Sequence, residues 1–119
     1  MGNDAMQLFE DQPIRSAWDA EREEWYFSVV DVVGVLTDSG DPAAYWRKLK
    51  QRLKEEGNET VTNCHGLKMT AADGKKRLTD VADTEQLLRI IQSIPSPKAE
   101  PFKLWLAQVG WKRMEETIG

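Results

Sequence analysis

The chain has 119 residues and a formal net charge of −4, with 40% apolar and 30% charged residues, which excludes an intrinsically disordered chain. No apolar run approaches the roughly 20 residues of a membrane span and no signal-peptide pattern is present, so we expect one cytoplasmic domain, residues 1–119. One cysteine, Cys64, and one histidine, His65, exclude a disulfide framework and a Cys/His zinc site within one chain.

The net charge hides an asymmetry along the sequence. Residues 1–38 contain nine acids and two bases, whereas residues 39–80 contain nine bases and six acids. Because local fields matter more than the total charge, a positive middle region can bind an anion in an acidic protein. The acidic first third would then repel phosphate from the wrong face.

Three short strands are predicted in the first third of the chain. Residues 7–9 form the first, and residues 14–19 form the second because their side chains alternate with a period of two. Residues 24–28 are rich in aromatic side chains that favour strands, and they follow a polar loop. Together these segments predict a small antiparallel sheet.

Residues 29–36 are ambiguous. Their β-branched side chains favour a strand, but the apolar positions recur at helical spacing. Ser28 and Asp31 have the spacing of a capping box, with Asp in place of the usual Glu, and this favours a helix.

The most distinctive segment is a basic helix that follows a tight loop at residues 38–40. Asp41 and Pro42 are suited to the N-cap and the first helical position, and Gly57 to the C-terminal cap. Residues 45–54 carry five cations and no acid. The apolar side contains Tyr45, Trp46, Leu49 and Leu53; the opposite side contains Arg47, Lys50 and Lys54, with Lys48 and Arg52 on a flank.

A β-hairpin is predicted after the basic helix. Residues 60–64 are strand-like, residues 67–71 alternate in polarity, and the chain returns at 76–79. Asp73-Gly74 lies where a two-residue type I′ turn would connect the strands. Lys75, Lys76 and Arg77 would therefore lie at or beside the hairpin tip.

Two further helices are predicted. Asp83 or Thr84 caps the first, whose inner stripe is Leu87, Leu88 and Ile91. A proline-rich elbow follows, and the last helix begins between residues 97 and 101. That helix has one apolar face formed by Phe102, Trp105, Leu106 and Val109, and a second formed by Leu104, Ala107, Trp111 and Met114.

The cationic segments are suited to nucleic acid. Each lysine or arginine that neutralises a phosphate adds about 0.9 to the salt dependence of binding. A helix after a short helix and a tight loop fits the major groove, where arginine reads guanine and glutamine reads adenine. The alternative is an ordinary solvated face. The candidate DNA-binding residues are Arg47, Lys48, Lys50, Gln51, Arg52, Lys54, Lys75, Lys76 and Arg77.

Catalysis is not expected. Cys64 and His65 are neighbours, and neighbouring side chains of a strand point to opposite sides, so they would not meet as nucleophile and base. The sequence has no glycine-rich phosphate loop and no metal-ligand spacing, so we expect no cofactor and no metal.

The order of these segments resembles the Bro family N-terminal domain of prophage antirepressors. The later stretches resemble its bacterial branch, which is similar to DNA-damage-inducible protein D, and the resemblance covers about residues 7–116. It implies an α+β DNA-binding domain with a regulatory role, usually followed by a variable second domain, so we expect the N-terminal part of a longer protein. The stretches that carry it are residues 25–33 (WYFSVVDVV), 45–49 (YWRKL), 60–64 (TVTNC), 77–83 (RLTDVAD), 96–102 (SPKAEPF) and 105–107 (WLA).

We therefore predict an α+β fold, with a small antiparallel sheet and hairpins packed against about four helices. The first functional hypothesis is an antirepressor or transcriptional regulator that binds double-stranded DNA, and replacement of Arg47, Lys50 and Lys54 by alanine should remove most affinity. The second is a protein-binding module that titrates a repressor or forms a homodimer. Its surface would be Leu104, Trp111 and Met114, because a helix with two apolar faces either lies inside its own domain or docks a partner.

Overall fold

The computed structural model describes residues 3–58, 64–71 and 73–118, with the side chains of 5–58, 64–71 and 73–109. Within these ranges the fold is a five-stranded antiparallel sheet with four helices, so the predicted α+β class is confirmed. The strands are β1 (Asn3–Phe9), β2 (Gln12–Asp19), β3 (Glu24–Ser28), β4 (His65–Thr70) and β5 (Lys76–Asp83), in the order β1-β2-β3-β5-β4. The helices are α1 (Val29–Thr37), α2 (Pro42–Glu55), α4 (Thr84–Gln92) and α5 (Ala99–Ile118).

The first three strands confirm the prediction, except that β1 begins at Asn3 rather than at residue 7 and β2 begins at Gln12 rather than at residue 14. Their register places Ser16 opposite Phe27 and Trp18 opposite Trp25. One side chain of each pair, Phe27 and Trp25, belongs to the main core. The opposite face of the sheet carries a smaller buried cluster of Ala17, Tyr26, Met69 and Val81.

The ambiguous segment after β3 is a helix. The Ser28 hydroxyl accepts a hydrogen bond from the backbone N–H of Asp31 at 3.4 Å, as the capping pattern predicts. Five of the nine residues of α1 are buried, so packing on both sides outweighs the strand preference of valine. α1 therefore lies at the centre of the core.

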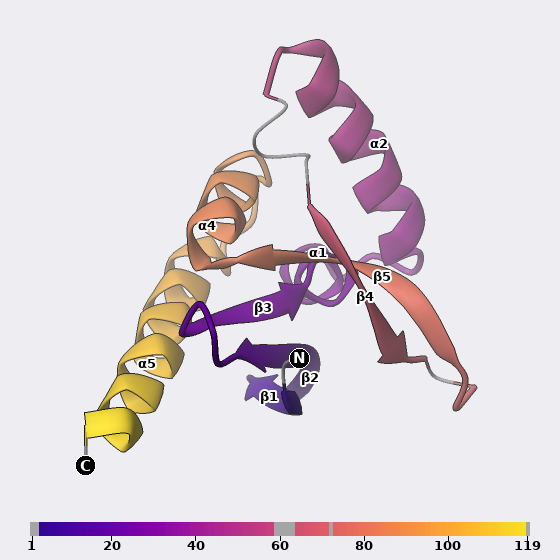
Figure 1. The fold of residues 1–119 in the computed structure, drawn as a ribbon. Coiled ribbons are helices and arrows are strands. Elements are labelled where there is room, and N and C mark those ends of the chain that lie inside the picture. Colours follow the sequence, from indigo (N-terminus) through magenta and orange to yellow (C-terminus); the bar gives the residue numbers. More distant parts are fainter. Residues whose placement is uncertain (1–2, 59–63, 72, 119) are drawn as a thin grey trace.

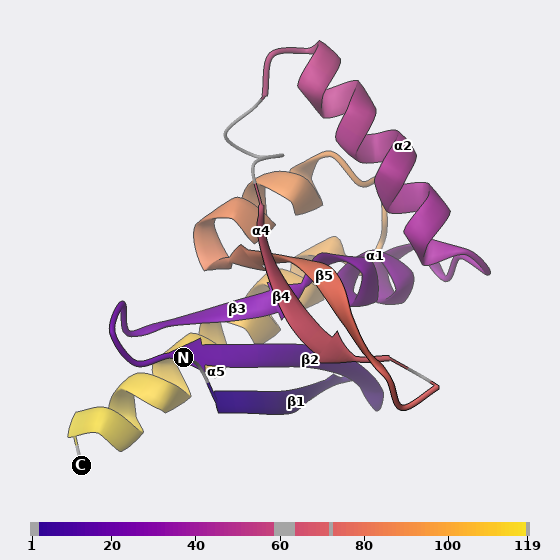
Figure 2. The same cartoon turned by 45° about the vertical axis from the view of Figure 1, so that its right-hand side comes forward.

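α2 begins and ends as the sequence predicts. The Asp41 carboxylate accepts from the backbone N–H of Ala44 at 3.1 Å, and Pro42 occupies the first helical position. Gly57 has a φ of +85° just beyond the helix, a conformation that glycine adopts without a steric penalty. In Figures 1 and 2, α2 projects away from α4 and α5 toward one side of the molecule.

β4 and β5 extend from the sheet as a two-stranded ribbon. β3 pairs only with the last three residues of β5, whereas β4 pairs with β5 from Val81 to Lys76. We call β4 with residues 76–80 of β5 the β4–β5 ribbon; its far end points to the same side as the start of α2 (Figure 2). The predicted strand residues 60–63 lie outside the described residues, and Cys64 precedes β4.

The turn of this ribbon differs from the prediction. A two-residue type I′ turn needs positive φ at two successive residues, but only Gly74, at +84°, has it among the described residues 71 and 73–75. The connection spans 71–75, with the Gly74 N–H donating to the Ala71 carbonyl and the Ala71 N–H donating to the Lys75 carbonyl. A connection longer than two residues, with one glycine in the left-handed conformation, thus takes the place of the predicted two-residue turn.

α4 and α5 cover the core on the side of the molecule that lies away from α2 (Figure 1). Asp83 caps α4, and Gln86 completes a capping box. Ile90 is fully buried where the predicted stripe had Leu88, which is only partly buried. α5 begins within the predicted range, and Phe102 and Leu106 are in the core as predicted.

Candidate nucleic-acid interface

The outward face of α2 is polar and cationic. Trp46, Leu49 and Leu53 are buried in the core, so the helix is fixed with its other side toward solvent. The predicted residues on that exposed side are Arg47, Lys48, Gln51, Arg52 and Lys54. In the described part of the chain, Arg47, Lys48 and Lys54 form no ion pair.

Lys50 does not lie with these exposed cations. Its ammonium group is 2.8 Å from the Asp80 carboxylate in β5, and 5.9 Å from the centre of the Trp46 ring. The indole N–H of Trp46 donates to the same carboxylate oxygen at 3.0 Å. Lys50 therefore contributes to packing between α2 and β5, and its predicted place on the outer face is corrected.

The Asp80 carboxylate is held in its charged form. Partial burial raises its pKa, but the hydrogen bonds from Lys50 and Trp46 outweigh this effect, and the pKa lies below the usual value. The side chain of Asp80 is 32% exposed. A charged Asp80 therefore persists at neutral pH between α2 and the β4–β5 ribbon.

Arg52 is exposed but partly anchored. Its guanidinium donates to the Ser93 carbonyl at 3.2 Å, in the turn after α4, and lies 4.0 Å from the Glu56 carboxylate. The side chain remains 58% exposed. Arg52 can bind an anion only if its guanidinium N–H groups are shared between that anion, the Ser93 carbonyl and the Glu56 carboxylate.

The ribbon tip carries the second predicted cluster. Lys75, Lys76 and Arg77 are exposed, and Arg77 forms an ion pair with Asp73 at 2.6 Å. This hydrogen bond is the main reason that the pKa of Asp73 is lowered. Because the pair is on the surface, its attraction is screened and Arg77 can exchange partners.

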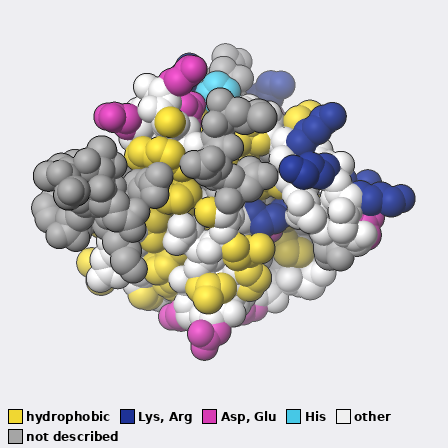
Figure 3. Space-filling model, turned by 60° about the horizontal axis from the view of Figure 1, so that its bottom comes forward, with side chains coloured by type: hydrophobic (Ala, Val, Ile, Leu, Met, Phe, Trp, Pro, Cys, Tyr) yellow, Lys and Arg dark blue, Asp and Glu magenta, His cyan; other side chains and the backbone are white. Residues whose placement is uncertain are grey.

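Sequence reasoning missed Lys68 as a member of this surface. Lys68 pairs with Leu78 and Thr70 with Lys76, so their side chains share the ribbon face that contains Asp80 and is turned toward α2. The period-two alternation of side chains along residues 68–70 and 76–80 is the sequence signal from which this shared face could have been inferred. Figure 3 shows Lys and Arg side chains gathered toward one end of the molecule, where Figure 1 draws the ribbon tip.

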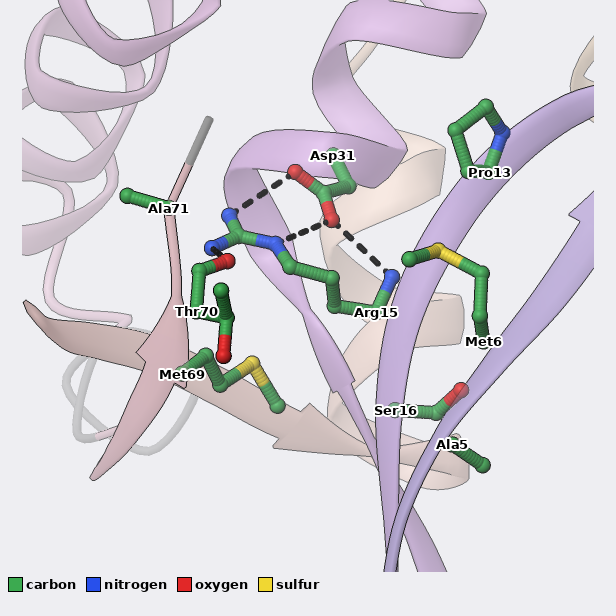
Figure 4. A pocket seen from close by; sticks show the side chains of 9 residues that line it. All are labelled: Ala5, Met6, Pro13, Arg15, Ser16, Asp31, Met69, Thr70 and Ala71. Carbon is green, nitrogen blue, oxygen red and sulfur yellow. Dashed lines mark hydrogen bonds and ion pairs between the residues drawn. The ribbon is translucent and has the colours of Figure 1, made fainter. Parts of the chain in front are cut away.

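A second acid–base pair lies beside the far end of β4. Arg15 of β2 donates to both carboxylate oxygens of Asp31 in α1, at 2.8 and 3.0 Å, and to the carbonyl of Thr70, the last residue of β4, at 3.0 Å (Figure 4). The guanidinium also donates to the Ser28 hydroxyl at 3.3 Å, and the backbone N–H of Arg15 donates to the Asp31 carboxylate at 2.9 Å. The hydrogen bond to Asp31 raises the pKa of Arg15, although burial opposes this.

This pair forms the floor of a groove of about 610 Å³. The walls are largely apolar, with Met6 and Met69 on opposite sides (Figure 4). Every nitrogen of the Arg15 guanidinium already donates to a protein acceptor, so the groove has no uncommitted arginine for an anion. It does not belong to the cationic surface.

Cys64 and His65 lie in different surroundings. Burial and the charge of Asp80 raise the pKa of Cys64 to about 11, so its thiol is protonated at neutral pH. The exposed His65 ring packs edge-on against Tyr26, with centroids 5.6 Å apart.

The predicted partner face of α5 is described only in part. The side chain of Leu104 is 68% exposed, whereas the side chains of Trp111 and Met114 lie outside the described residues. Leu104 points away from the core formed by Phe102 and Leu106, as the two-faced pattern predicts. No helix in the described ranges has the length and apolarity needed to span a bilayer. Among the described residues, no cluster of three His, Cys, Asp or Glu side chains is suited to hold a metal ion.

An exposed cationic helix beside a basic ribbon, on a small α+β scaffold, defines a candidate nucleic-acid-binding domain. Comparison with protein families agrees: residues 13–110 match the family model for the BRO family, N-terminal domain. The chain therefore belongs to the BRO family, and the family suggests a phage-type DNA-binding regulatory domain. Searches of curated proteins and of solved structures returned no match.

Proposed function

We propose that this domain is an antirepressor or transcriptional regulator of phage type, and that it binds double-stranded DNA through α2 and the tip of the β4–β5 ribbon. On α2 the contacting residues are Arg47, Lys48, Gln51, Arg52 and Lys54, and on the ribbon Lys75, Lys76 and Arg77. Such a regulator acts in the cytoplasm, with no chemical step, no cofactor and no metal.

The observation that carries this proposal is the state of the α2 cations. Arg47, Lys48 and Lys54 are exposed and form no ion pair with a described residue, although acids outnumber bases in the chain. A face kept only for solubility usually mixes both signs of charge. Unpaired cations at helical spacing match the phosphates of a duplex, which attract them over a Debye length of about 8–10 Å.

The test compares two variants of equal net charge. Replacing Arg47, Lys48 and Lys54 with alanine should lower the slope of log K against log salt by about 2.7, since each lost phosphate contact removes about 0.9. The control replaces three cations outside this surface, Arg22, Arg89 and Lys103, and should change the slope far less. Equal losses in both variants would remove α2 from the proposed interface.

A second candidate function is supported by one observation, the exposure of Leu104 on α5. In this candidate the domain binds a repressor or a second copy of itself through Leu104, Trp111 and Met114. Leu104→Glu should then give a folded monomer in size-exclusion chromatography and should abolish capture of a repressor in a nuclease-treated pull-down. An unchanged elution volume together with unchanged capture excludes this surface.

A further inference from the structure

α2 and the β4–β5 ribbon are separate elements that meet at Asp80. One oxygen of this carboxylate accepts from Trp46 and from Lys50, which lie one turn apart on α2, at 3.0 and 2.8 Å. Asp80 itself is opposite Gly66 in β4, next to Val81, where β5 leaves the ribbon and pairs with β3. It therefore fixes α2 at the base of the ribbon.

The contact is specific in its geometry. The Trp46 ring is 4% exposed and is part of the core, so the position of its N–H is set by packing. Lys50 reaches the same oxygen with its ammonium group over the face of that ring, 5.9 Å from its centre. A carboxylate that accepts from two fixed donors has little freedom, and this limits the angle between helix and ribbon.

The charge of Asp80 acts on DNA binding in two opposite ways. As an acid between two cationic elements, it repels phosphate and lowers the affinity for any polyanion. As the acceptor for Trp46 and Lys50, it keeps α2 and the ribbon in one arrangement. If removal of the Asp80 charge weakens DNA binding, the positioning role is the larger one. If removal tightens binding, the repulsion of phosphate is the larger one.

We propose that Asp80 is a positioning residue, which holds α2 and the β4–β5 ribbon so that both contact the same duplex at once. This inference rests on the proposed DNA binding, and it adds that the two cationic elements act as one surface. The cations joined in this way are those of α2 and, on the ribbon, Lys68, Lys75 and Lys76, because Arg77 pairs with Met69 on the opposite ribbon face. Without Asp80 each element binds separately and with fewer simultaneous phosphate contacts.

The experiment compares Asp80→Asn with Glu55→Gln in the full chain. Both substitutions remove one negative charge near the cationic surface, but Glu55 is exposed at the last residue of α2. Glu55→Gln should tighten binding to a random-sequence duplex slightly, through electrostatics alone. Asp80→Asn should weaken it about fivefold or more, and should lower the salt slope by about 2 as the ribbon contacts are lost.

Each outcome decides a different point. If Asp80→Asn tightens binding as Glu55→Gln does, with an unchanged circular dichroism spectrum, the positioning role is wrong while DNA binding stands. If the unaltered chain binds no duplex, the proposed function and this inference both fail. If Asp80→Asn does not fold, Asp80→Glu replaces it, because this variant keeps the net charge and only moves the carboxylate. It should still weaken binding, and unchanged affinity would overturn the inference.

Discussion

α1 and α2 are consecutive helices with opposite tasks. α1 has no cation and buries five of its nine residues in the core, so it supports the fold from the inside. α2 buries three of its fourteen residues and turns a row of cations to solvent. The difference teaches that the helix before the loop is committed to the core, whereas the helix after it leaves most of its surface, including its cations, in contact with solvent.

The largest expected effect separates these two tasks. Leu36→Ala in α1 should lower the free energy of unfolding by about 2–5 kcal/mol, because Leu36 is 3% exposed and the substitution leaves a cavity. Arg47→Ala in α2 should change it by less than about 0.5 kcal/mol, since its side chain is exposed. Urea denaturation followed by tryptophan fluorescence measures both. Similar losses in both variants would show that the two helices do not divide the tasks in this way.

A smaller effect is expected where Arg15 contacts Asp31 and the end of β4. Arg15→Met leaves the Asp31 carboxylate, 18% exposed, without its main partner, which should cost about 1–3 kcal/mol of unfolding free energy. Arg22→Met, in the exposed loop between β2 and β3, is the matched control and should cost less than about 0.5 kcal/mol. Thermal denaturation of the two variants provides the comparison. Equal melting temperatures would mean that the Arg15 contacts contribute nothing to stability.

The smallest effect concerns pH and Asp80. Its pKa is lowered in the folded protein, so the folded chain binds fewer protons than the unfolded chain in acid. The stability that the charged group contributes is present above its unfolded pKa of about 3.9 and is lost as the pH falls through the lower folded value. With the side chain about one-third exposed, we expect less than about 1 kcal/mol. Asp80→Asn should therefore be less stable than the unaltered chain at pH 7, and the difference should shrink below pH 4; a constant difference contradicts this account.

Local signals in the sequence predicted most of the fold. Ser28 and Asp31 correctly favoured a helix over a strand, because a cap satisfies backbone N–H groups whatever the intrinsic preference of valine. Asp41 with Pro42 and Gly57 likewise marked the two ends of α2. Such signals act within a few residues, so a single sequence displays them.

The predictions that the structure corrects depend on contacts or pairing between segments that are separated in the sequence. Asp80 lies 30 residues after Lys50, and the helical pattern of α2 contains no sign that a strand carries an acid to that position. The turn at Asp73-Gly74 was wrong for a related reason. The dipeptide fits a type I′ turn, but the pairing of Thr70 with Lys76 requires a longer connection.

The central claim is tested most directly by measuring the binding of the unaltered chain to double-stranded DNA across a range of salt concentrations. The surface of α2 and the ribbon tip predicts a slope of log K against log salt of about −4.5 to −6.3, from roughly five to seven phosphate contacts. Selection from random duplexes at two of these concentrations then separates sequence-specific from general binding. Absence of binding at low salt, or a slope near zero, would contradict a cationic surface that binds a duplex.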